Sequence, residues 1–373
     1  MDDITVNVIS PKNRIEIEDI PSQGKRSVIW LHDIVPHQNI DPNKLLVEEK
    51  QRLESFDWFQ NDHFFVLDSY VGLPDTTKLL YLPLYLYSEA KQYSEVFKNL
   101  KLDFPKKKYA LNCCSNYPRP HRIVASCWLA NYGSQFQFTY TQSWTQSDFL
   151  DHLNEFLQIG NIVDWTYSFG PTIKMLDKLY KGTVPNLKNV QYVPSINFEK
   201  NIKYLVDQSV FSLVLESDTW EKQCVLSEKY LQAVYGGTIP ILFGYGSYDI
   251  LDNMGLDSFK DIINTSNQYE PNLVTRTWKI LSDNADMFNH ATELIRDPQI
   301  QKRIQNNLNI VRNYHDWLVK SILNCNSHAT IEKFLKIQNQ IEQKLKWSLM
   351  GKINKTHYKI VVDEIIAHST KIN

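Results

Sequence analysis

Glu216, Glu228 and Lys229 have the residue types and spacing expected of a site for a phosphorylated sugar nucleotide. Glu216 directly follows an apolar run, and the other two fall in the first turn of a predicted helix capped by Ser227. A helix N-terminus with a lysine beside it attracts anions, and a glutamate can accept hydrogen bonds from sugar hydroxyls. The same residues would also suit a helix start that binds nothing, because a first-turn glutamate complements the helix dipole.

The surrounding segment predicts one βαβ unit. Phe211–Leu215 is an apolar run typical of a buried parallel strand. The helix that follows Ser227 has an apolar stripe and ends at Gly236, and Thr238–Phe243 predicts the second strand. Ligands of open α/β sheets bind at the carboxyl ends of the strands. The expected site therefore lies at the sheet edge where Glu216 stands.

Two arginines in the segment Asn116–Arg122 form a second candidate anion site. A strand is expected over Tyr109–Cys114, followed by a proline-containing loop and a helix that begins at His121. Arg119 and Arg122 flank this helix start, and a planar guanidinium suits two oxygens of one phosphate. The alternative is a capped helix start with exposed arginines, and we expect His121 to be a packing or capping residue.

Carboxylates that follow strands in the N-terminal half are candidates for a general base. Asp33 ends the run VIWLHD and Asp68 ends the run FFVLD. A carboxylate at a strand end can take a proton from an acceptor hydroxyl, although an aspartate at that place also caps turns. Glu89 is a third candidate.

Composition and missing motifs exclude several classes of function. The 373-residue chain has a formal net charge of −2, which argues against a protein that coats nucleic acid. It has no GxxxxGK[ST] loop, no complete GxGxxG and no DxD pair, which argues against P-loop kinases, redox dinucleotide sites and metal-held sugar diphosphates. Five cysteines without a CxxC pair favour a reducing compartment. Without a predicted signal peptide or apolar run of about 18 residues, we expect a cytoplasmic protein with no membrane span.

The pattern of elements predicts an α/β chain in three parts. Residues 1–185 are expected to form an N-terminal α/β domain, residues 186–325 a C-terminal nucleotide-sugar-binding α/β domain, and residues 326–373 a helical tail. The crossing between the first two is placed in Val184–Ser195, because of its two prolines. The first part is expected to contain a helix over Glu89–Leu100 and four strands, at Ile4–Ile9, Val28–Leu31, Phe64–Leu67 and Leu79–Leu84. In the second part, the segment Ser258–Asn264 is also strand-like.

The block Phe211–Gly244 resembles the donor-site pattern of the family-10 glycosyltransferases, the α-1,3-fucosyltransferases. That pattern is F-x-L-x-x-E-[NS], a loop, [ST]-E-K, a helix and x-x-P-[IV]-x-x-G, and this chain departs from it with Ser217 where asparagine is common. The segment NYPRPHR resembles a motif of phage-encoded relatives of the family. The resemblance covers roughly residues 109–312, is specific in the first block, and leaves the N-terminal half unaligned.

The resemblance implies a GT-B-type fold, in which two Rossmann-like domains face a central cleft, with helices at the C-terminus. It implies that Arg122 and Lys229 bind the donor diphosphate, and Arg119 stays a donor-binding candidate on its residue type and place alone. It also implies that Glu228 binds the ribose and that Glu216 meets the sugar or stabilises its developing positive charge.

These expectations describe an inverting, metal-independent glycosyltransferase that uses a GDP- or UDP-linked sugar and no further cofactor. A single displacement at the anomeric carbon is expected, with Asp33 or Asp68 as the base. The acceptor is either a glycan hydroxyl or a hydroxymethylated base of phage DNA in the host cytoplasm, which the basic stretch Lys98–Lys108 could help to hold. A non-catalytic binding module on the same fold is the remaining alternative.

Overall fold

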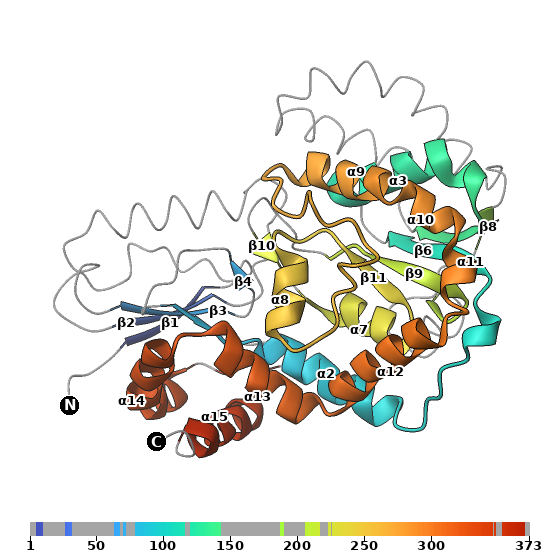
Figure 1. Cartoon of the computed structure of the whole chain (residues 1–373). Helices are drawn as coiled ribbons and strands as arrows, with labels where there is room; N and C mark the ends of the chain where they lie inside the picture. The colour runs from blue at the N-terminus through green and yellow to red at the C-terminus, as the bar shows by residue number, and fades with distance from the viewer. Residues whose placement is uncertain are drawn as a thin grey trace.

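In the described part of the chain, two parallel β-sheets are accompanied by many helices, which confirms the predicted α/β class (Figure 1). The computed structural model describes residues 5–9, 27–31, 63–67, 70–71, 79–115, 120–142, 187–189, 206–216, 223–224, 226–345, 347 and 353–369.

The smaller sheet has four strands in the order β1-β2-β3-β5, all parallel. Their bounds are Thr5–Ile9, Ser27–Leu31, His63–Leu67 and Leu79–Tyr81. All four predicted runs therefore form strands, but the last ends before the predicted Leu84. Helix α2 (Leu84–Val96) begins there, because Pro83 cannot donate to a strand ladder and its fixed φ suits a helix start. The helix predicted from Glu89 thus starts more than a turn earlier.

The larger sheet has five parallel strands in the order β11-β9-β6-β7-β8. Their bounds are Ile239–Leu242, Ser209–Val214, Tyr109–Ser115, Phe138–Gln142 and Leu187–Asn189. Strands from both sides of residue 185 hydrogen-bond in this sheet, and β8 lies inside the segment expected to be the domain crossing. The chain therefore passes from one sheet to the other between β5 and β6, not at residue 185.

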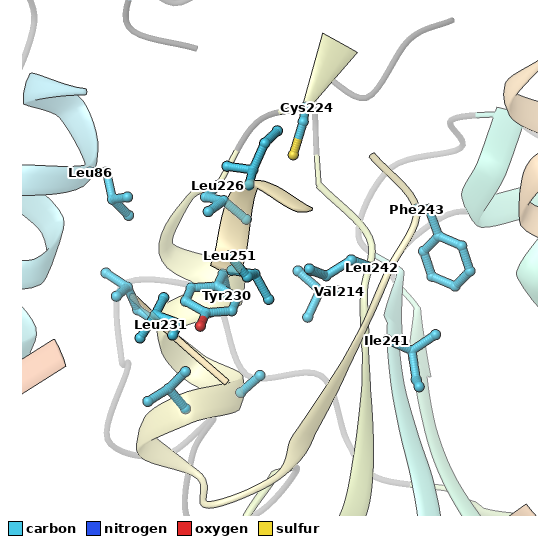
Figure 2. Close-up of a cluster of buried hydrophobic side chains, with 14 of the residues drawn as sticks. Leu86, Val214, Cys224, Leu226, Tyr230, Leu231, Ile241, Leu242, Phe243 and Leu251 are labelled. Carbon is cyan, nitrogen blue, oxygen red and sulfur yellow. The ribbon is translucent and has the colours of Figure 1, made fainter. Parts of the chain in front are cut away.

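The predicted βαβ unit is confirmed as β9, α7 and β11. Helix α7 (Glu228–Tyr235) starts at the N-cap Ser227 and ends at Gly236. Gly237 follows with φ +65°, a conformation that glycine adopts without steric cost, and Leu102 packs where its side chain would be. Apolar side chains of α7 pack against those of β9 and β11 in a buried cluster, with Tyr230 and Leu231 on one side and Val214 and Leu242 on the other (Figure 2).

Helices cover both faces of the larger sheet. In the view of Figure 1, α3 (Pro120–Tyr132) packs with α9 (Leu273–Asp283) above the sheet, and α7 lies below it with α12 (Pro298–Arg312). The remaining described helices have these bounds: α8 Ser247–Asn253, α10 Ala285–Asn289, α11 Ala291–Leu294, α13 Tyr314–Cys325, α14 His328–Lys344 and α15 Lys355–Ser369, with 3-10 turns at Phe104–Lys106 and Gly133–Gln135.

The described part of the tail is helical, as predicted, and returns to the first half of the chain. Helix α14 contacts β1 and β5, and α15 contacts α2 and α13. A short antiparallel pair also joins the halves: β4 (Tyr70–Val71) follows β3, and its partner β10 (Gln223–Cys224) lies between β9 and α7. None of the helices in the described ranges is both long and apolar enough to cross a bilayer.

The strand-like prediction for Ser258–Asn264 is wrong, since these residues form turns. Phe259 has φ +55°, which no strand residue adopts, and its N–H donates to the Asp257 carboxylate at 2.9 Å. Arg303 holds the same carboxylate and that of Asp261 with a two-pronged contact to each. Local polar contacts therefore override the β propensity of this segment.

Lys107, from the basic stretch Lys98–Lys108, is buried rather than available to a DNA backbone. Its Nζ donates to the carbonyl oxygens of Asp207, Ser209 and Gly236 at 3.1, 2.8 and 2.9 Å. It therefore joins the start of β9 to the carboxyl end of α7. Burial lowers the pKa of Lys107 to about 7, against the opposing charges of Asp207 and Asp103.

We predict that the free energy of unfolding rises between pH 7 and pH 9 because of Lys107. Its folded pKa lies below the unfolded value, so the folded state binds fewer protons in this window and gains stability as the pH increases. The slope can reach about 1.4 kcal/mol per pH unit. Urea denaturation across this range should show a flatter profile for Lys107→Met than for the wild type and for the exposed neighbour variant Lys108→Met. Parallel profiles for all three proteins would contradict the assignment.

Candidate functional site

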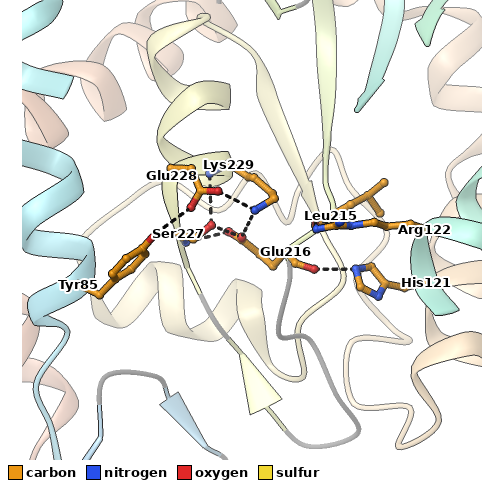
Figure 3. Close-up of polar contacts among 8 residues, drawn as sticks. All are labelled: Tyr85, His121, Arg122, Leu215, Glu216, Ser227, Glu228 and Lys229. Atoms are coloured by element: carbon orange, nitrogen blue, oxygen red, sulfur yellow. Dashed lines mark hydrogen bonds and ion pairs between the residues drawn. The ribbon is translucent and has the colours of Figure 1, made fainter. Parts of the chain in front are cut away.

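The candidate site lies where β9 ends and α7 begins, at the carboxyl edge of the larger sheet. Glu216 leaves β9 after Leu215 and is 3% exposed. The Ser227 backbone N–H donates to Glu216 Oε1 at 2.8 Å, and the Ser227 hydroxyl donates to Oε2 (Figure 3). The Ser227 hydroxyl also accepts from the Lys229 N–H at 3.4 Å. The carboxyl group of Glu216 thus fixes the N-terminus of α7 onto the end of β9.

Lys229 stands between the two glutamates. Its Nζ is 2.8 Å from Glu228 Oε1 and 3.9 Å from Glu216 Oε2. The side chains of Lys229 and Glu228 are 21% and 24% exposed, so both still reach solvent while Glu216 does not. This arrangement leaves a solvent-accessible ammonium and carboxylate side by side at a helix start, where a phosphate and a sugar hydroxyl could each find a partner.

The pKa values of the two glutamates shift in opposite directions. Burial would raise the pKa of Glu228, but the charge and hydrogen bond of Lys229, with contacts from Ser227, outweigh it and lower the pKa to about 2. Burial raises the pKa of Glu216, and the nearby Glu228 adds to that effect, so that Lys229 and Ser227 offset it only in part. The pKa of Lys229 is raised, because the two carboxylates outweigh its burial and the repulsion from Arg122. The site therefore keeps its cation at neutral pH.

The start of α3 supports the end of β9. The Arg122 guanidinium is 1% exposed and donates to the Leu215 carbonyl through Nε at 3.2 Å and Nη2 at 2.9 Å. The His121 Nε2 lies 2.7 Å from the Glu216 carbonyl oxygen. Both side chains thus hold the backbone that carries Glu216, as Figure 3 shows. This agrees with the packing role expected for His121 and shows that Arg122 is not a surface arginine.

A second buried arginine holds the neighbouring strand in the same way, and sequence reasoning missed it. Arg276 of α9 is fully buried and donates through Nε to the Phe243 carbonyl at 2.8 Å. Since Leu242 of β11 pairs with Val214 of β9, the Phe243 and Leu215 carbonyls are at the same level of the sheet. Arg122 and Arg276 therefore place two buried positive charges at one edge. The available signal was an arginine on the otherwise apolar face of a predicted helix.

The helix α2 contributes a contact from the other half of the chain. Tyr85, in its first turn, lies with its hydroxyl 3.5 Å from Glu228 Oε2. One turn later on α2, Glu89 is fully buried. Glu89 is therefore one helical turn from the residue that contacts Glu228, but its buried side chain cannot reach an acceptor in solvent as a general base would.

Of the predicted site residues, the structure brings Arg122, Glu216, Glu228 and Lys229 together. The other three, Asp33, Asp68 and Arg119, lie outside the described residues. In the described ranges, no three His, Cys, Asp or Glu side chains are grouped as metal ligands would be, and metal independence stays a prediction. Comparison of the chain with protein-family models, with curated proteins and with solved structures gives no match.

Proposed function

We propose that this chain is an inverting, metal-independent glycosyltransferase that moves a sugar from a nucleotide-diphosphate sugar to an acceptor hydroxyl. The observation that carries the proposal is that Lys229 and Glu228 pair at the N-terminus of α7, next to the end of β9 that Arg122 holds. A helix start with a protonated lysine suits a diphosphate, and an ionised glutamate beside it suits ribose hydroxyls.

In this proposal the leaving diphosphate is stabilised by the Lys229 ammonium and the backbone N–H groups of the first turn of α7. Arg122 adds positive charge close to Lys229, and its hydrogen bonds to the Leu215 carbonyl keep the strand end in place. Glu216 is a positioning residue for α7, since its carboxyl group is buried on Ser227. Its expected contact with the transferred sugar stays part of the proposal.

The two parallel sheets are consistent with a GT-B arrangement, and we propose that the smaller sheet carries the acceptor side in a cytoplasmic protein. The antiparallel pair β4–β10 and the contact of Tyr85 with Glu228 support this, because both bring the first half of the chain to the donor-side segment. A hydroxymethylated DNA base is the less supported acceptor, since Lys107 is buried and Lys106 pairs with Asp103 at 2.9 Å.

The proposal is tested by donor binding and transfer. GDP- and UDP-linked sugars should be screened for a rise in melting temperature, because a ligand that binds only the folded state stabilises it more as its concentration rises above Kd. The donor that binds should then be assayed for transfer to glycan and hydroxymethylated DNA acceptors. Binding without transfer or hydrolysis would favour the non-catalytic binding module, and the absence of binding by every donor would refute the proposal.

We predict that transfer persists in excess EDTA. The sequence has no DxD pair, so the diphosphate charge must be met by Lys229, Arg122 and backbone amides. The initial rate with EDTA should stay close to the untreated rate, with a known metal-dependent glycosyltransferase as the control for chelation. A full loss of rate that Mn²⁺ or Mg²⁺ restores would contradict metal independence.

A further inference from the structure

The turn that follows β11, Gly244–Gly246, lies beside the candidate site. Continuing the register of β9 and β11 by two residues places Gly244 at the level of Glu216. Cys224 packs against this turn so closely that a Cβ on Gly244 would be 2.9 Å from Cys224 Sγ. The carboxyl ends of two adjacent parallel strands thus lie at one edge of the sheet, and an extended ligand at the start of α7 can reach the turn after β11.

Two tyrosines cover this turn. The rings of Tyr245 and Tyr269 are 5.2 Å apart and nearly perpendicular, at 79°. Gly246 has φ +64°, and a Cβ there would be 3.0 Å from Tyr269 Cε1, so the ring lies directly on the backbone. Tyr269 is nevertheless 48% exposed. Tyr269 is the aromatic member of the exposed large apolar side chains in the described part of the chain. The others are Val96, Ile360 and Ile366.

Both rings are held in place from behind. The Arg276 guanidinium lies 5.7 Å from the centre of the Tyr245 ring, and that arginine is itself fixed on the Phe243 carbonyl. The Tyr269 hydroxyl donates to the Asp249 carboxylate, which Lys260 also contacts. An exposed ring that is fixed in this way loses little conformational freedom when a flat ligand stacks on it.

We propose that Tyr269, supported by Tyr245, stacks on the nucleobase of the donor. This inference rests on the proposed function, because it assumes that the diphosphate occupies the start of α7. Every nucleobase has a π-face, so stacking alone tolerates GDP and UDP and is stronger for the larger purine ring. The structure therefore assigns Tyr269 to base binding and the α7 cluster to the diphosphate and ribose.

The test compares ligands with and without a base on the wild type and on Tyr269→Ala. Isothermal titration calorimetry should show that the variant loses about 5- to 150-fold in affinity for GDP or UDP. Its affinity for inorganic pyrophosphate should stay unchanged. Tyr269→Phe keeps the ring without the hydroxyl and should bind nucleotides nearly as the wild type does, and Val96→Ala is the matched control for removing an exposed apolar side chain.

Each other outcome has a defined meaning. Equal nucleotide affinity in wild type and Tyr269→Ala overturns the inference and leaves the proposed function intact. An equal loss for nucleotide and pyrophosphate also overturns it, because the side chain would then act on the fold of the edge. If the wild type binds neither GDP, UDP nor a sugar derivative of either, the proposed function fails together with this inference.

Discussion

Replacement of Lys229 by alanine should weaken the binding of a nucleoside diphosphate by about 10- to 150-fold. A hydrogen bond to a charged group contributes about 1.5–3 kcal/mol, and Lys229 offers its ammonium next to the N–H groups of α7. The variant also leaves Glu228 without its 2.8 Å partner, so a negative charge faces the incoming diphosphate. Calorimetry with GDP and UDP measures the effect directly.

The control for Lys229→Ala is Lys355→Ala. Lys355 also pairs with a glutamate, Glu342 at 3.3 Å, but it lies in the C-terminal helices away from the candidate site. Its loss should leave nucleotide affinity unchanged. Glu228→Gln complements the test, because it keeps the lysine and should weaken nucleotides more than inorganic pyrophosphate, which has no ribose. If folded Lys229→Ala binds nucleotides as tightly as the wild type does, the donor site has been placed wrongly.

The part of the site that sequence predicts well is held together by short-range interactions. Ser227 caps α7, and Glu228 and Lys229 follow it in the first turn, so their positions depend on local helix geometry. Glu216 comes directly after a fully buried strand, and the strand pattern alone places it at the carboxyl edge. The four strands of the smaller sheet were predicted for the same reason, since each is a short apolar run with its own boundaries.

What the sequence could not show depends on contacts between distant segments. The three carbonyls around Lys107 lie a hundred or more positions away along the chain, so the sequence did not show that this lysine of the basic stretch is buried. Arg122 and Arg276 donate to backbone carbonyls just beyond β9 and β11, and the local sequence pattern does not show which carbonyl each arginine contacts. Strands from both sides of residue 185 pair in the larger sheet, which the sequence could not show, because prolines mark a loop but not which strands pair across it.

Replacement of Asp33 by asparagine should reduce sugar transfer by about 10²- to 10⁴-fold and leave donor affinity unchanged. A general base within hydrogen-bond reach of the acceptor hydroxyl contributes a rate factor of that size. Asp33 and Asp68 lie outside the described residues, but the structure describes the two strands that precede them, β2 and β3. Leu31 ends β2 and pairs with Leu67, which ends β3, so the chain leaves both adjacent strands at the same level of one edge.

That edge is where a base for the acceptor would be expected, because ligands of parallel sheets bind beyond the carboxyl ends of adjacent strands. Asp68 follows β3 directly, whereas Asp33 follows β2 after one further residue, so Asp68→Asn is the natural second variant. Single-turnover transfer and donor binding should be measured on both. A large loss of rate in one variant, at unchanged donor affinity, identifies the base. Transfer at the wild-type rate in both variants would mean that neither aspartate is the base. The proposal that the smaller sheet carries the acceptor side would then lose its support.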